Sequence, residues 1–174
     1  MAISTGLKAA CPAPSLHRSL CLVDLDDLIS AYWEHYRLAH GVREDRLRAD
    51  DLFWAWEAVE AVVRGETEQE FWFDSRLQKA VESVAQGYEG QQYAHRPLDV
   101  LVKLSDLAPT EEALGYLGAG PVEDYLVYGQ PDLSGVEEAA KHNPRFRIAL
   151  RCAWFDDKIS PEDAARLRKL VPGP

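Results

Sequence analysis

The sequence predicts a single all-α domain, a compact right-handed stack of about eight or nine short antiparallel helices that pair as helical hairpins. Apolar residues recur at helical spacing along most of the chain, and capping residues and prolines stand where such helices would begin. No segment longer than four residues alternates like a half-buried strand. We expect residues 1–22 to form a flexible N-terminal arm, since they show no periodicity, and residues 23–174 to form the helical domain.

Helix boundaries can be predicted from local signals. Asp24 has the residue type of an N-cap and precedes an apolar stripe that ends before Gly41, and Gly65 has the type that ends a second helix. Residues 118–121 read as a turn, with Pro121 opening the next helix. The remaining start signals are Asp50 or Asp51, Thr67 with Glu70, Pro97, Thr110, Ser134 with Glu137, Asn143 with Pro144, and Ser160 with Pro161.

The composition narrows the classes of partner. A net charge of −10 disfavours binding to nucleic acid or to an anionic membrane surface, because phosphates would be repelled. No apolar run approaches the roughly 18 residues that a membrane-spanning helix needs. Three cysteines without metal or redox spacing are typical of free thiols in a reducing cytosol. We therefore expect a cytoplasmic protein without a cofactor.

Residues 50–74 combine acidic and aromatic side chains to an unusual degree, with eight acids against one base, Arg64. One helix face cannot bury Phe53, Trp54 and Trp56 together, because successive residues point about 100° apart. Some of these rings must face a neighbouring helix, the N-terminal arm or a partner. Two-sided packing inside the stack and a docking surface for a basic protein both explain the pattern.

The favoured functional hypothesis is a non-catalytic protein-interaction module that binds a basic partner, for example an immunity or antitoxin protein. Residues 120–124 are the second candidate surface, although acids early in a helix are also explained by the helix dipole. The predicted partner-binding residues are Trp54, Glu57, Glu60, Glu68, Trp72, Glu123 and Asp124.

Two alternatives remain open. One is an enzyme or small-molecule binder with a site assembled from distant residues, for which Glu123, Asp124, His35 and Trp33 are candidates. The other is a homo-oligomer that uses the aromatic surface for self-association. The scattered histidines lack the spacing of a zinc site, so no metal is expected.

Several segments resemble a known family. They read LGAGPVEDYL over residues 117–126, VEEAA over 136–140 and NPRFRIAL over 143–150, followed by Trp154. This pattern resembles a family of small helical bacterial proteins known only as a domain of unknown function. The resemblance covers roughly residues 25–155, and residues 88–95 look like an insertion relative to the family. It implies a bacterial, all-helical, cytoplasmic protein and brings no activity with it.

Overall fold

The computed structural model describes residues 23–41, 43–66, 74–86 and 96–171, and these residues form helices with no strand among them. Within this part of the chain the helices join into eight uninterrupted runs, so the predicted all-α class is confirmed. The right-handed antiparallel sense of the stack stays a prediction. The elements are α1 (Leu25–Ala39), α2 (Arg43–Ala49), η1 (Asp50–Leu52), α3 (Phe53–Arg64), α4 (Ser75–Val81), η2 (Glu82–Gln86), α5 (Pro97–Leu107), α6 (Glu111–Leu117), η3 (Gly118–Val122), α7 (Glu123–Val127), α8 (Leu133–His142), α9 (Pro144–Cys152) and α10 (Pro161–Arg168).

Most predicted helix starts are confirmed by their capping contacts. The Asp24 carboxylate accepts from the Asp27 amide at 2.7 Å, and Asn143 accepts from two backbone amides at the start of α9. Pro97 is the first residue of α5, as predicted. The cap of α8 differs, because Asp132 rather than Ser134 accepts the N-terminal amide. Asp74 caps α4, whereas the predicted capping box at Thr67 and Glu70 lies outside the described residues.

The turn predicted at residues 118–121 was wrong. These residues form a π-helix, η3, that joins α6 to α7 in one continuous helical run. Pro121 lies inside it without a break, because the wider register of a π-helix accommodates a residue that lacks an N–H. Gly118 serves close packing rather than a turn, since a Cβ there would stand 2.1 Å from the Ala149 carbonyl oxygen of α9.

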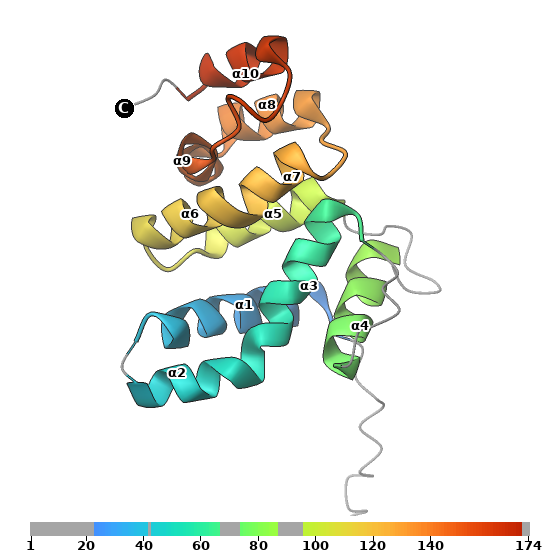
Figure 1. Cartoon of the computed structure of the whole chain (residues 1–174), viewed down its shortest axis with the longest axis vertical. Coiled ribbons are helices and arrows are strands. Elements are labelled where there is room, and N and C mark those ends of the chain that lie inside the picture. Colours follow the sequence, from blue (N-terminus) through green and yellow to red (C-terminus); the bar gives the residue numbers. More distant parts are fainter. Residues whose placement is uncertain (1–22, 42, 67–73, 87–95, 172–174) are drawn as a thin grey trace, which may run out of the picture.

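Helix α3 links the α1–α2 end of the molecule to its middle. In Figure 1 it runs from α1 and α2 toward α7, with α4 beside it. The core is continuous around it and includes the fully buried rings of Tyr32, Phe146 and Phe155. The Trp33 indole donates to the Leu104 carbonyl at 3.2 Å and so ties α1 to α5. No helix in the described part of the chain is long and apolar enough to cross a membrane.

Candidate functional site

One face of α3 carries aromatic and acidic side chains in succession. Phe53, Trp56, Glu60 and Arg64 follow one another at steps of three or four residues, and Glu57 lies four residues after Phe53, which places them along one side of the helix. The Phe53 ring is 43% exposed and stacks on Trp56, with a centroid separation of 5.3 Å and an interplanar angle of 21°. Trp56 and Glu57 are half-buried. This stripe reaches the surface at Phe53, and Asp50 and Asp51 are exposed just before it.

Arg64 joins this stripe to α7. Its guanidinium donates to the Asp124 carboxylate at 2.7 Å and lies 3.4 Å from the Glu60 carboxylate. Both carboxylates are largely buried, since each side chain is only 13% exposed. The two surfaces that the sequence suggested separately, around Glu60 and around Asp124, therefore meet at one point.

Glu60 lies in an environment that disfavours the ionised form of its carboxyl group. Burial raises the pKa of its carboxyl from 4.5 to about 7, and the neighbouring Asp124 carboxylate adds to the rise while Arg64 opposes it. One guanidinium does not compensate two largely buried carboxylates, so the pair holds a proton for part of the time at neutral pH.

Tyr116 of α6 packs against rings of α1. Its ring centroid lies 5.1 Å from that of Tyr36 and 5.3 Å from that of His40. Burial raises the pKa of Tyr116, and the charge of Glu60 raises it further. We call Phe53, Trp56, Glu60, Tyr116 and Asp124 the acidic–aromatic site.

Tyr32 on α1 has a buried hydroxyl. Its ring is 1% exposed and lies against Trp33, at a centroid distance of 4.9 Å. The hydroxyl has no hydrogen-bond partner among the described residues. Burial is the main cause that raises the pKa of Tyr32.

A family model described as a family of unknown function, DUF6869, matches residues 64–173. The chain belongs to this family. The predicted relation to a domain of unknown function is therefore confirmed. Comparison with curated proteins and with solved structures gives no match. The DUF6869 match includes Arg64, Tyr116 and Asp124, whereas Trp56 and Glu60 precede it, so the acidic–aromatic site combines the DUF6869 region with the helices before it.

The structure separates the predicted partner-binding residues into three groups. Glu57, Glu60 and Asp124 lie at or beside the acidic–aromatic site. Trp54 does not offer an exposed ring: it is 8% exposed and packs in the core, with the Arg76 guanidinium 5.7 Å from its ring centroid. This correction follows from helix geometry, because Trp54 points about 200° away from Trp56. Glu68 and Trp72 lie outside the described residues.

Glu123 makes structural contacts and is not part of the acidic–aromatic site. Its carboxylate pairs with Lys158 and accepts from the Trp154 backbone amide at 3.2 Å. Because adjacent helical residues diverge, Glu123 holds α7 to the segment before α10 while Asp124 holds α7 to α3. The two carboxylates therefore do not form a joint catalytic pair.

The other residues suggested for an assembled site do not converge on Glu123. Trp33 donates to a backbone carbonyl, as described above, and His35 is buried with its ring 5.8 Å from Phe53. Burial lowers the pKa of His35. Sequence reasoning also missed Tyr32, Tyr36 and Tyr116, which resemble ordinary core residues when they are seen only along their own helices.

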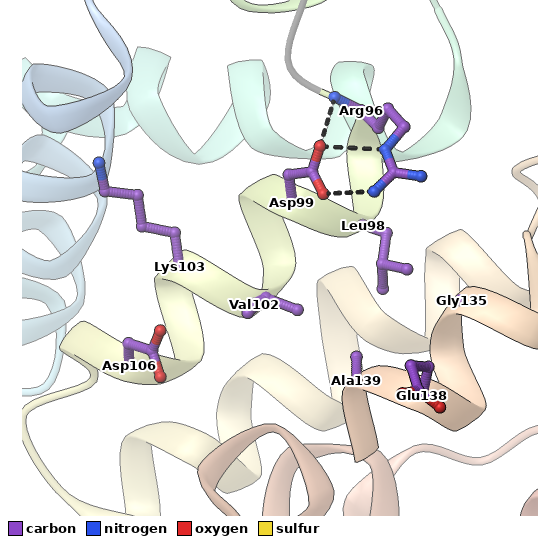
Figure 2. Close-up of a pocket in the computed structure, with 9 residues that line it drawn as sticks. All are labelled: Arg96, Leu98, Asp99, Val102, Lys103, Asp106, Gly135, Glu138 and Ala139. Carbon is purple, nitrogen blue, oxygen red and sulfur yellow. Dashed lines mark hydrogen bonds and ion pairs between the residues drawn. The ribbon is translucent and has the colours of Figure 1, made fainter. Parts of the chain in front are cut away.

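A groove of about 560 Å³ lies between α5 and α8 (Figure 2). Its wall contains the apolar side chains of Leu98, Val102 and Ala139. The charged residues along it are already engaged by neighbours: Arg96 with Asp99 at 3.0 Å, Lys103 with Asp26, Asp106 with the Asn143 amide at 2.8 Å, and Glu138 with Lys141 at 4.0 Å and with His142. The charged side chains of the groove therefore all have partners on the same or neighbouring helices.

The cluster of basic residues on α9, at positions 145, 147 and 151, does not lie entirely on the surface. Arg145 donates to the Ser105 carbonyl at 2.8 Å and to the Ala108 carbonyl, so it fastens α9 to the end of α5. Arg147 and Arg151 are exposed beside a hollow of about 150 Å³. The cluster therefore does not act as one continuous cationic surface.

Proposed function

We propose that the protein is a non-catalytic interaction module that binds a basic protein partner through the acidic–aromatic site. The observation that carries this proposal is the convergence of Glu60 and Asp124 beside the stacked rings of Phe53 and Trp56. Rings at the centre of an interface supply binding energy, and fixed charges around them supply orientation and a faster association.

The overall charge supports the same class of partner. At a net charge of −10 the protein attracts basic proteins and repels nucleic acid and anionic lipid. A cytoplasmic immunity or antitoxin protein that neutralises a basic toxin is one concrete form of this role. The resemblance to small bacterial proteins fits that setting.

The test compares two charge reversals of equal size. The tagged chain, with Glu57→Lys or with Glu138→Lys, is used to capture proteins from the host lysate at low and moderate salt, with identification by mass spectrometry. Association rates are then measured with the purified partner. Glu57 borders the acidic–aromatic site, whereas Glu138 lies on α8 along the other groove.

We expect Glu57→Lys to slow association roughly tenfold at low salt and to reduce its salt dependence, while Glu138→Lys changes it by less than about twofold. Phe53→Ala should weaken binding through faster dissociation, because it removes an exposed ring without changing charge. Equal effects of the two charge reversals would rule out a specific role for this face.

A second function, small-molecule binding or proton-transfer catalysis, is favoured by one observation. A carboxyl group whose pKa is about 7 can donate and accept a proton at neutral pH, and Glu60 lies close to Asp124 near a π-helix. Thermal-shift screening of metabolites against the wild type and Glu60→Gln tests this alternative. A compound that stabilises only the wild type would favour it over the interaction role.

A further inference from the structure

We propose that the exposed ring of Phe53 docks into the hollow beside Arg147 and Arg151 of a second copy of this chain, so that copies associate head to tail. This inference goes beyond the proposed function, because it assigns a second binding surface, on α9, and names its occupant. Both proposals use the side of α3 that carries Phe53 and Glu57, so a basic partner and a second copy compete for it.

The hollow combines an apolar wall with a cationic edge. Its volume is about 150 Å³, and its lining residues are Arg147, Ile148 and Arg151 of α9 with Leu170 and Val171 after α10. The two arginines are one turn apart on one side of α9, and both are exposed. Neither guanidinium has an ion-pair or hydrogen-bond partner among the residues that the structure describes. The hollow therefore fits an apolar group that is flanked by acids.

The start of α3 presents such a group. The Phe53 ring is 43% exposed and is held by its stack on Trp56. Asp50 lies three residues before Phe53 and Glu57 four residues after it, which places one carboxylate on each side of the ring along the helix. Within the described part of the chain, neither carboxylate forms an ion pair. An apolar cavity of about 150 Å³ accommodates a benzene ring, so the hollow is large enough for a phenyl group.

The two surfaces do not meet within one molecule. Phe53 begins α3 beside α1 and α2, whereas α9 and α10 lie at the other end of the molecule in Figure 1. A contact between the ring and the hollow therefore joins different copies. Because the two surfaces differ, a dimer still offers one free ring and one free hollow, and assembly continues head to tail.

The local complementarity acts against the overall charge. Each copy has a net charge of −10, so two copies repel each other at long range. Salt at about 0.15 M screens charges that are more than roughly 8 Å apart, whereas the carboxylates and guanidinium groups of this contact are closer than that. We therefore expect weak self-association at this salt concentration, with a dissociation constant on the order of 0.1 mM.

The experiment measures the mass of the full chain by analytical ultracentrifugation, up to about 1 mM protein in about 0.15 M salt. Glu57→Arg is combined in turn with Arg147→Glu, with Arg151→Glu and with Lys141→Glu, and these three reversals change the net charge equally. Lys141 is the matched control, because it is an exposed cation on α8 that does not line the hollow. Phe53→Ala removes the ring without changing the charge. Circular dichroism and melting curves check that each variant is folded.

We expect the average mass of the wild type to rise continuously with concentration and not to level off at a dimer. Phe53→Ala, Glu57→Arg and the reversal of either arginine should each weaken association about tenfold, while Lys141→Glu changes it by less than about threefold. Glu57→Arg together with one of the two arginine reversals should restore association to within about threefold of the wild type, because the charges of one contact are exchanged. Glu57→Arg together with Lys141→Glu should restore nothing.

The outcomes separate the two proposals. A wild type that stays monomeric at about 1 mM overturns self-association, and capture of a basic partner that depends on Glu57 then leaves the proposed function standing. Association that neither arginine reversal weakens, or that neither exchanged pair restores, overturns the assignment of the hollow. If Glu57→Arg does not fold, Phe53→Ala and the arginine reversals decide the outcome. Self-association with rescue but without a captured partner upholds the head-to-tail contact and counts against the proposed function.

Discussion

Replacing Glu60 with glutamine tests whether this carboxyl group destabilises the fold when it is ionised. Glutamine has nearly the same shape as a protonated glutamate. Its amide can donate to Asp124 and accept from Arg64, so it preserves the contacts of the neutral form. The variant therefore removes only the titration of Glu60.

The sign and size of the effect follow from the pKa of Glu60. Burial raises this pKa from 4.5 to about 7, so the folded protein binds the proton more tightly than the unfolded chain does. The resulting stabilisation is complete below pH 4.5 and is lost as the pH rises from 4.5 to about 7. At about 1.4 kcal/mol per pH unit, the loss amounts to roughly 3–4 kcal/mol. The Glu60→Gln variant does not lose this stability, because glutamine does not ionise.

The assay is thermal unfolding of the wild type and Glu60→Gln from pH 5 to pH 8. The two proteins should melt at similar temperatures at pH 5, and the variant should melt roughly 6–12 °C higher at pH 8. Glu57→Gln controls for the loss of one negative charge on the same helix face. If the melting temperatures of the wild type and Glu60→Gln change in parallel across this range, the buried-carboxyl explanation is refuted.

Three other variants test contacts that hold the helices around the site. Arg64→Met should destabilise the fold by about 2 kcal/mol in urea unfolding, because it leaves two nearly buried carboxylates without a cation; unchanged stability would contradict the bridge. Gly118→Ala should lower the free energy of unfolding by about 3 kcal/mol or prevent folding, since its Cβ would meet the Ala149 carbonyl. Gly120→Ala should be neutral or stabilising by up to about 1 kcal/mol, because a Cβ there has nothing within 4 Å. If both glycine variants behave alike, the close approach is not what limits this position. Asn143→Ala should cost about 1–2 kcal/mol in the same assay, because two amides of α9 lose their acceptor; a cost near zero would mean that the cap is dispensable.

The helical class and most helix starts could be predicted because they depend on neighbours in the chain. A cap such as Asp24 or Asn143 acts on amides two or three residues away, and an apolar stripe repeats within one helix. The acidic and aromatic character of α3 was visible for the same reason. The sequence did not show which of these rings would be buried. Trp54 lies in the core while Phe53 and Trp56 reach the surface, because the neighbouring helices decide which side of α3 is covered.

The candidate site itself depends on packing between distant segments. Arg64 and Asp124 are sixty residues apart and lie on different helices, so no local spacing predicts that they meet. Residues 118–121 also could not be predicted from local sequence. Their glycines and proline indicate a turn, but in the structure they form a π-helix where α9 packs against them. Local periodicity and capping decide where helices form. The packing of their faces decides which charges lose their water, and so which carboxyl group has a raised pKa.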